Sequence, residues 1–194
     1  MSTKINYEVP TWNQIYDMLL NQAHTIQSQK FKPDIIIGIA RGGLVPACIL
    51  TDLLGTPELT SIQIEFYTDI NQKQIEPILK QKLATQLTGK KTLLVDDIVD
   101  SGQSLRLAKT HLKQQNALEI KTATLYQKPQ STIIPNFYEK QTTSWVVFPW
   151  DTKETLRRIA QNQKGKRELN QEVTKLVKAG LTKKLAEKLL KDLQ

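Results

Sequence analysis

The segment LLVDDIVDSGQSL, residues 93–105, combines an apolar run, three acids and a short turn that contains Gly102. KTLLVDD (91–97) is predicted to be a buried strand that ends in carboxylates, because a short apolar run bounded by turn residues is typical of a strand inside a parallel sheet. A helix is expected from about Ser104 to Gln115. The segment therefore predicts a strand, an acidic loop and a helix in immediate succession.

The loop of this segment contains the groups needed to bind a sugar phosphate. Backbone N–H groups at a helix start form an anion site, and the small hydroxyl residues within 101–104 add donors. The carboxylates of Asp96 and Asp97 suit sugar hydroxyls or a magnesium ion, both of which require acceptors. From the spacing alone, an acidic strand end followed by an ordinary serine cap stays open as the alternative.

Further apolar runs alternate with helical patterns along the chain. Strands are expected at 35–39, 61–67, 122–126 and 144–148, and helices at 12–28, with Thr11 as a cap, and at 44–54, with a stop at Gly55. Residues 68–89 are polar and lack a convincing period. The alternation predicts an α/β domain with a mainly parallel sheet flanked by helices.

The C-terminal tail differs from the rest of the chain in charge. Residues 1–151 contain 15 Lys/Arg and 14 Asp/Glu, and residues 152–194 contain 12 and 5, so that +7 of the net charge of +8 lies in the tail. Two sets of apolar residues at steps of three or four, separated by Gly180, predict short amphipathic helices with lysines opposite. We expect a catalytic domain at 1–151 and a basic helical extension at 152–194 with a structural or interaction role.

The composition favours a cytoplasmic protein without a membrane partner. The sequence has no apolar run of about 18 residues, and MSTKINYEVP at its start has no apolar core of the signal-peptide type. Cys48, which lies in an apolar stretch, is expected to be a small core residue. Residues 38–43 do not satisfy G-x-G-x-x-G and the P-loop motif is absent, so dinucleotide-binding and P-loop sites are excluded.

Four motifs, in order, resemble those of the type I phosphoribosyltransferases. LLVDDIVDSGQSL is similar to their phosphoribosyl-pyrophosphate signature, and IIIGIARGGLVPACIL resembles their pyrophosphate loop, in the form found in xanthine-guanine and other 6-oxopurine enzymes. QKPQ (127–130) resembles their purine-contacting Lys-Pro, and SWVVFPWD (144–151) resembles their aromatic hood segment. The resemblance extends over about residues 33–151 and leaves the tail outside it.

The resemblance implies a role for each residue at these motifs. The implied catalytic residues are Asp96, Asp97 and Asp100, and the implied 5′-phosphate ligands are Ser101, Gly102, Gln103 and Ser104. The implied pyrophosphate ligands are Ala40, Arg41, Gly42 and Lys73, and the implied purine contacts are Lys128, Trp145 and Val146. Magnesium is the implied cofactor, with Asp97 and Asp151 as candidate ligands, and helix capping is the alternative for Asp151. The segment 65–77 resembles a mobile catalytic loop, with Tyr67 and Lys73 as lid residues, although the relatives have Arg where Lys73 stands.

Asp100 and Lys128 favour 6-oxopurine bases within this family. The 6-oxopurine enzymes have Asp at the position of Asp100, whereas adenine, uracil and orotate enzymes have Ala or Thr. A carboxylate there can exchange a proton with purine N7 as the glycosidic bond forms. By the same resemblance, Lys128 donates to O6 of the base, and an amino group at C6 could not accept that bond. A solvated surface lysine and a core tryptophan are the alternatives for Lys128 and Trp145.

The sequence therefore predicts a purine salvage enzyme. It would join hypoxanthine, guanine or xanthine to phosphoribosyl pyrophosphate and release pyrophosphate, as a homodimer or higher homo-oligomer; the sequence does not rank the three bases. One alternative is a non-catalytic regulator of the same fold that senses phosphoribosyl pyrophosphate and binds nucleic acid through the basic tail. Another is an adenine or pyrimidine enzyme. Nucleic acid is not an expected partner, because the tail has no aromatic residue on which bases could stack.

Overall fold

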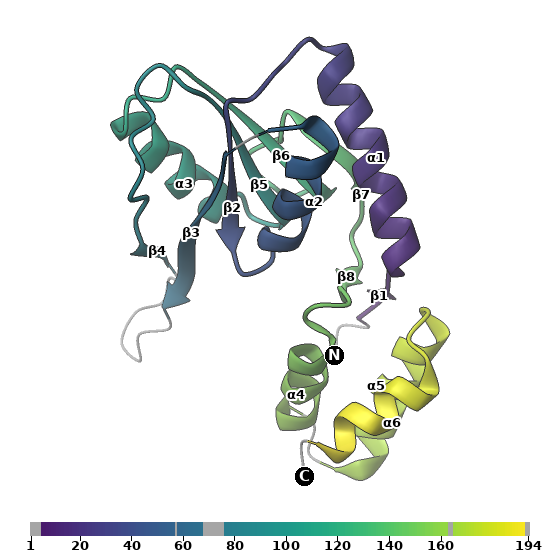
Figure 1. Ribbon diagram of the computed structural model, residues 1–194. Helices are drawn as coiled ribbons and strands as arrows, with labels where there is room; N and C mark the ends of the chain where they lie inside the picture. The colour runs from purple at the N-terminus through teal and green to yellow at the C-terminus, as the bar shows by residue number, and fades with distance from the viewer. Residues whose placement is uncertain (1–4, 57, 68–75, 163–164, 193–194) are drawn as a thin grey trace. The chain divides into compact units, whose positions relative to one another are not determined.

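The computed structural model describes residues 5–56, 58–67, 76–162 and 165–192. The chain forms two compact units, one of residues 16–142 and a smaller one of residues 1–15 and 143–194 (Figure 1). These two units divide the chain after residues 15 and 142. The expected boundary between a catalytic domain and an extension, after Asp151, concerns function and stays a prediction.

The smaller unit combines a two-stranded sheet with three helices. Strand β1 (Tyr7–Glu8) pairs in parallel with β8 (Trp145–Val146), and the helices are α4 (Thr152–Asn162), α5 (Lys166–Lys178) and α6 (Lys183–Lys191). The helices α5 and α6 and the break between them at Gly180 confirm the prediction of short helices in the tail. The strand expected at 144–148 is confirmed only at Trp145–Val146, and these two residues pair with β1 and not with the six-stranded sheet.

The apolar faces of the three helices pack together, as their periodicity predicts. The buried residues of this core are Val147, Leu156, Ile159, Leu176, Leu181 and Ala186. Gly180 ends α5 with a φ of +122°. The hydroxyl of Tyr7 donates to Glu172 at 2.8 Å, which ties the N-terminal segment to α5. Burial, and then the Glu172 carboxylate, raise the pKa of Tyr7.

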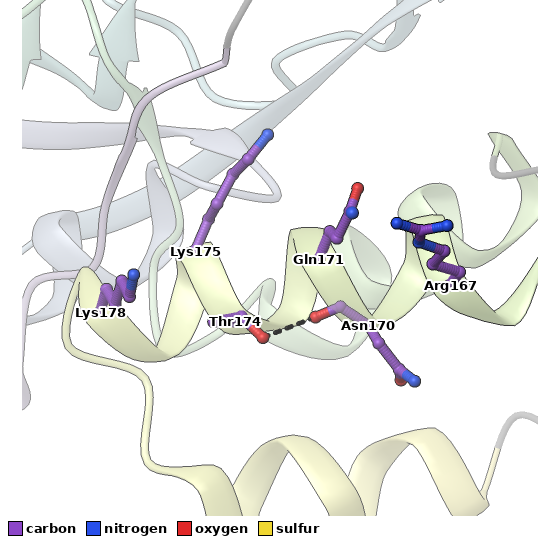
Figure 2. A pocket seen from close by; sticks show the side chains of 6 residues that line it. All are labelled: Arg167, Asn170, Gln171, Thr174, Lys175 and Lys178. Atoms are coloured by element: carbon purple, nitrogen blue, oxygen red, sulfur yellow. Dashed lines mark hydrogen bonds between the residues drawn. The ribbon is translucent and has the colours of Figure 1, made fainter.

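The outer side of α5 is polar and basic. An open groove of about 600 Å³ runs along it (Figure 2). It is lined by Arg167, Asn170, Gln171, Thr174, Lys175 and Lys178. Lys175 forms an ion pair with Glu172, one turn away on the same helix. The groove contains no aromatic side chain, so it offers no platform for stacked bases.

The larger unit is built on a six-stranded sheet with the order β4-β3-β2-β5-β6-β7. The strands are β2 (Ile35–Ala40), β3 (Glu58–Tyr67), β4 (Glu76–Gln81), β5 (Lys91–Val99), β6 (Glu119–Gln127) and β7 (Phe137–Gln141). Only the β3–β4 pair is antiparallel among these neighbours. This sheet confirms the predicted α/β fold with a mainly parallel sheet.

Several strands of this sheet differ from the sequence prediction. Strands β4 and β7, at the two edges of the sheet, were not predicted, because edge strands expose polar residues and lack a buried apolar run. Strand β5 continues to Val99, two residues beyond the predicted end at Asp97. Strand β3 begins at Glu58, before the predicted start.

Helices cover both faces of this sheet (Figure 1). Ile35, Ile37 and Ile39 alternate along β2 and pack in one core with residues of α3 (Gln103–Gln114). On the other face, Gly38 lies against Ala47 of α2 (Leu44–Leu54), close enough that a Cβ at Gly38 would come 3.1 Å from that of Ala47. Helix α1 (Trp12–Ser28) reaches β6 through Gln22, whose amide donates to the carbonyl of Thr124 at 2.8 Å.

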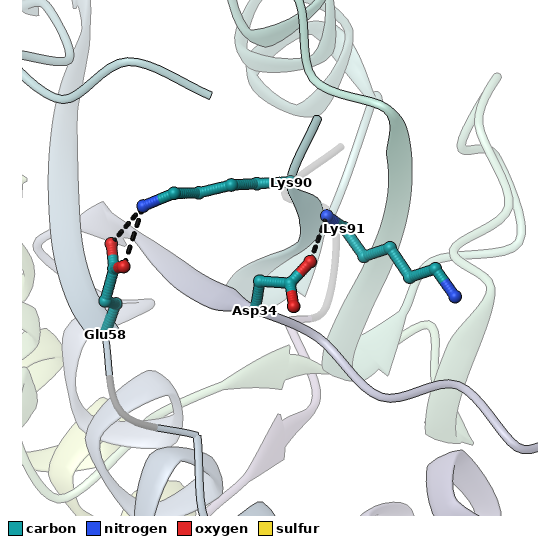
Figure 3. Close-up of polar contacts among 4 residues, drawn as sticks. All are labelled: Asp34, Glu58, Lys90 and Lys91. Carbon is teal, nitrogen blue, oxygen red and sulfur yellow. Dashed lines mark hydrogen bonds and ion pairs between the residues drawn. The ribbon is translucent and has the colours of Figure 1, made fainter. Parts of the chain in front are cut away.

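Polar contacts align the starts of three strands (Figure 3). The N–H of Lys91 donates to the Asp34 carboxylate at 2.7 Å, and the N–H of Asp34 donates to the carbonyl of Lys91 at 2.8 Å. The Lys90 ammonium contacts both oxygens of Glu58 at 2.6 and 2.7 Å. Because β2, β3 and β5 start level and run in parallel, their carboxyl ends emerge at the opposite edge of the sheet.

The helix ends agree with the local sequence, but two apolar side chains are more exposed than their sequence context suggests. Thr11 caps α1, because its hydroxyl accepts the N–H of Gln14 at 3.3 Å while the Gln14 side chain accepts the N–H of Thr11 at 2.8 Å. Gly55 ends α2 with a φ of +62°. Cys48 is exposed on α2, so the core role expected for it is wrong. Trp12 stands at helical spacing with Ile15 and Leu19, which are buried, but Trp12 itself is exposed.

His111 of α3 makes folding stability depend on pH. Its ring is 7 % exposed, and Nε2 accepts the N–H of Leu83 at 3.1 Å. Burial, and then the charge of Lys82, lower the pKa of His111 below its usual 6.5. The unfolded chain therefore binds the proton more readily, and this contribution to stability is present above about pH 6.5 and lost as pH falls through the lowered pKa.

The variant His111→Gln tests this pH dependence, because glutamine keeps a hydrogen-bond acceptor but does not titrate. We expect its urea midpoint to fall less between pH 7 and pH 5 than that of the unaltered protein. An equal fall of the urea midpoint in the two proteins would contradict this.

Candidate functional site

The carboxyl ends of β2, β5 and β6 bring most of the predicted site residues to one edge of the larger unit. These three strands are neighbours and parallel, so the loops that follow them lie side by side. In open α/β sheets this edge is where ligands bind. The residues after β2 include Arg41, those at the end of β5 include Asp100, and Lys128 follows β6.

Asp96 and Asp97 form a half-buried pair of acids at the end of β5. The N–H of Asp97 donates to Oδ1 of Asp96 at 3.0 Å. Burial of the Asp96 carboxyl, and then the negative charge of Asp97, raise the pKa of Asp96 well above its usual value. A bound cation or hydroxyl donors would relieve this cost, because both favour the charged form of a carboxyl group.

The acid pair fits magnesium only as part of a complex with a ligand. Within the described ranges, no cluster of three or more His, Cys, Asp or Glu could hold a metal ion by itself. Mg²⁺ is commonly bound by one or two carboxylates together with substrate phosphates. The donor set of Asp96 and Asp97 matches that mode of binding.

The turn after β2 lies directly against the acid pair. A Cβ at Gly42 would lie 2.2 Å from Oδ2 of Asp97, and one at Gly43 would lie 2.3 Å from the carbonyl oxygen of Val95. The peptide bond between Ala40 and Arg41 is cis. Arg41 is exposed at this turn. The turn therefore brings the backbone that follows Arg41 against the acid pair, and an arginine near carboxylates suits a ligand with both anionic and hydroxyl groups.

The loop after β5 is arranged for an anion. Gly102 has a φ of +87° and immediately precedes α3, and Ser101 Oγ accepts the N–H of Gln103 at 3.4 Å. A cavity of about 220 Å³ adjoins this helix start. It is lined by Phe66, Asp96, Ile98, Val99, Asp100, Ser101, Gly102, Gln103, Ser104 and Leu105. All four residues predicted to bind a phosphate thus line one cavity, which stands at a helix N-terminus.

The segment after β6 lies beside the end of β5. Lys128 is only 7 % exposed, and its N–H donates to the carbonyl of Val99 at 2.9 Å. This burial is inconsistent with a solvated surface lysine. The side-chain amide of Gln130 donates to Oδ1 of Asp100 at 2.7 Å. Lys128 and Asp100 therefore belong to two strand ends that are hydrogen bonded to each other.

The remaining predicted residues are not placed at this edge by the structure. Trp145, Val146 and Asp151 belong to the smaller unit, and Lys73 lies outside the described residues. Trp145 is 48 % exposed, which is inconsistent with a core tryptophan. The carbonyl of Asp151 accepts the N–H of Thr155 at the start of α4, so Asp151 occupies a helix-capping position. The roles of these residues toward a base or a metal stay predictions.

Two residues at the site were not singled out from the sequence. Phe66 is 49 % exposed and lines the cavity from β3. In the sequence, the one indication for Phe66 was its position near the end of the predicted strand 61–67. Gln130 belongs to the QKPQ motif, but nothing in that motif indicated that its amide contacts Asp100.

Comparisons with known proteins agree with this geometry. Residues 11–155 match the model of the phosphoribosyl transferase domain family. A xanthine-guanine phosphoribosyltransferase of Gluconobacter oxydans is 31 % identical over 150 residues, which are 76 % of this chain and 86 % of that protein. The crystal structure of a purine phosphoribosyltransferase from Pyrococcus horikoshii is 35 % identical, with a TM-score of 0.68 over 74 % of this chain and 93 % of that one.

A third comparison concerns the fold alone. A xanthine-guanine-hypoxanthine phosphoribosyltransferase of Helicobacter pylori is similar with a TM-score of 0.68 and 20 % identity, over 77 % of this chain and 97 % of that one.

The close approach of Gly43 to β5 predicts that Gly43→Ala is strongly destabilising. The new Cβ would meet backbone atoms of Val95 and Ile39 at 2.3 and 2.9 Å, so a strand or a helix start must shift. We expect a loss of at least about 2 kcal/mol in the free energy of unfolding, measured by urea denaturation. Gly55→Ala is the control, because it meets no atom within 4 Å and loses only the ease of a positive φ. If Gly43→Ala were as stable as Gly55→Ala, the backbone of Gly43 would have to lie farther from the Val95 carbonyl than the 2.3 Å contact implies.

Proposed function

The chain belongs to the phosphoribosyl transferase domain family and is a purine phosphoribosyltransferase, and we propose that its base is a 6-oxopurine: hypoxanthine, guanine or xanthine. The reaction joins N9 of the base to C1 of phosphoribosyl pyrophosphate, which yields a nucleoside 5′-monophosphate and pyrophosphate. The observation that carries the proposal is the pairing of Lys128 with the end of β5, next to Asp100.

Lys128 and Asp100 together suit a 6-oxopurine better than adenine. An ammonium donates hydrogen bonds and accepts none, so Lys128 can bind O6 but not the exocyclic amino group of adenine. The carboxylate of Asp100 can exchange a proton with N7 of the base as the bond to ribose forms. The name of the relative from Gluconobacter oxydans, which includes xanthine and guanine, supports this choice.

In the proposed mechanism, the other residues of the edge hold the sugar and its phosphates. Residues 101–104 bind the 5′-phosphate through backbone N–H groups and hydroxyls, and Asp96 and Asp97 accept hydrogen bonds from the ribose hydroxyls. Arg41, with Lys73, binds the pyrophosphate as its bond to C1 breaks. The transition state at C1 resembles an oxocarbenium ion, so neighbouring carboxylates stabilise its developing positive charge.

Magnesium fits this proposal as a partner of the substrate. Asp97 would hold the ion, and Asp151 is a candidate ligand for a second one. When bound, Mg²⁺ neutralises charge on the leaving pyrophosphate. The residues of this chain orient the sugar, hold the phosphates and exchange the proton at N7.

The other expectations about partners have different support. None of the described helices is long and apolar enough to cross a membrane. The family and the relatives are enzymes, so a non-catalytic regulator that binds nucleic acid is not favoured. A cytoplasmic location and a homodimer stay predictions.

The choice of base is tested with a panel of five free bases. Adenine, uracil, hypoxanthine, guanine and xanthine are each mixed with phosphoribosyl pyrophosphate and magnesium, and turnover is followed spectrophotometrically. We expect turnover of at least one 6-oxopurine and little with adenine or uracil, because Lys128 cannot accept a bond from an amino group. Adenine as the best of the five substrates would overturn the assignment of Lys128 and Asp100.

The role of Asp100 is tested with Asp100→Asn, which keeps the size of the side chain and removes its ability to take a proton. We expect kcat with the best base to fall by about 100-fold or more, because general acid–base groups contribute on that order. Affinity for phosphoribosyl pyrophosphate, measured by calorimetry, should change little. Full activity in this variant would remove Asp100 from the proton transfer.

A further inference from the structure

The segment that follows β6 is fastened to the loop that contains Asp100. The N–H of Lys128 donates to the carbonyl of Val99 at 2.9 Å. Four residues further on, the N–H and the hydroxyl of Thr132 both donate to the carbonyl of Ser101, at 3.2 and 3.0 Å. The segment 128–132 thus bonds to the backbone on both sides of Asp100.

Gln130 stands midway along this segment and contacts the Asp100 side chain. Its amide nitrogen donates to Oδ1 of Asp100 at 2.7 Å. A carboxylate has two oxygens, so this bond occupies one of them and leaves Oδ2 for a ligand. Asp100 and Gln130 are both exposed, so neither side chain is held by core packing. The bond therefore selects one orientation of the Asp100 carboxylate among several that an exposed aspartate can adopt.

We propose that Gln130 is a positioning residue for Asp100. This inference rests on the proposed function, in which Asp100 exchanges a proton with the base. Gln130 acts through Asp100: it holds one carboxylate oxygen so that the other is directed to the position of N7. A proton transfer requires donor and acceptor within hydrogen-bond reach, so a carboxylate that turns freely spends part of its time in non-productive orientations.

The surroundings of Gln130 give the amide the fixed position that this role requires. The Arg106 side chain of α3 donates to the hydroxyl of Thr132 at 3.0 Å, which anchors the end of the segment to the helix. The segment also packs closely on the loop, since a Cβ at Gly102 would lie 3.1 Å from the nitrogen of Ile133. The backbone at 130 is therefore held relative to Asp100 from both sides, and the loop and the amide keep their spacing.

The test compares kcat and KM in a set of full-length variants. Gln130→Ala removes the amide, and Gln130→Glu keeps the size of the side chain but replaces the donor with an acceptor. Gln63→Ala is the matched control, because the amide of Gln63 donates to the Glu65 carboxylate at 2.8 Å and neither residue lines the cavity. Asp100→Ala and Asp100→Ala with Gln130→Ala complete a double-mutant cycle. Circular dichroism and urea midpoints verify that each variant is folded.

We expect Gln130→Ala to lower kcat by about 3- to 10-fold, the range of a typical net hydrogen bond, with the KM for phosphoribosyl pyrophosphate unchanged. Gln130→Glu should lower kcat at least as much, and Gln63→Ala should match the unaltered protein. In the Asp100→Ala background, Gln130→Ala should have no further effect. If the base panel identifies a base other than a 6-oxopurine, the proposed function fails and the same comparison is made with that base.

Four results would overturn the positioning role. The first is an unchanged kcat in Gln130→Ala. The second is an equal loss with and without Asp100, which would mean that Gln130 acts by another route. The third is full activity of Gln130→Glu, which would show that the size of the side chain matters and its donor does not. Full activity of Asp100→Ala by itself would remove both the proton-transfer role of Asp100 and the role of Gln130.

Discussion

The close approach of the turn after β2 to the backbone of β5 is the constraint on which the site depends. Gly43 lies so near the Val95 carbonyl that a side chain has no room, and Gly42 lies equally near the Asp97 carboxylate. Two adjacent glycines therefore allow α2 to start directly above the central strand. As a result, the turn that contains Arg41 and the acid pair, about 55 residues apart in the sequence, lie next to each other.

Two adjacent carboxyl groups and a helix N-terminus give this edge the electrostatics of a ligand-binding site. Asp96 and Asp97 are adjacent, half-buried and of like charge, and the raised pKa of Asp96 reports the cost of this arrangement. A fold selected for stability alone would not need two such groups at one strand end. The helix start at 102–104 attracts an anion next to them. A sugar that carries phosphate groups and hydroxyls satisfies both features, and the family of the chain agrees with that chemistry.

The smaller unit has a core of its own, built from residues at both ends of the chain. Tyr7 and Val9 from the N-terminal segment pack against buried residues of the tail helices, and β1 pairs with β8. The amphipathic tail helices thus have partners within their own unit. This explains how helices too short to be stable alone can form at the end of the chain. Three of the basic residues, Arg167, Lys175 and Lys178, line the α5 groove together with the polar Asn170, Gln171 and Thr174.

The sequence by itself determined the parts of the fold that depend on local burial and backbone conformation. The apolar runs of β2, β5 and β6, the cap at Thr11 and the glycine stops at 55 and 180 are of this kind. The contiguous residues 96–104 were also identified, because their chemistry lies in one stretch. The tertiary structure alone decided the edge strands β4 and β7, the exposure of Cys48 and the bond from Gln130 to Asp100. The physical reason is that a local pattern records whether a residue prefers burial, whereas a contact between distant segments depends on which strands pair and in which register.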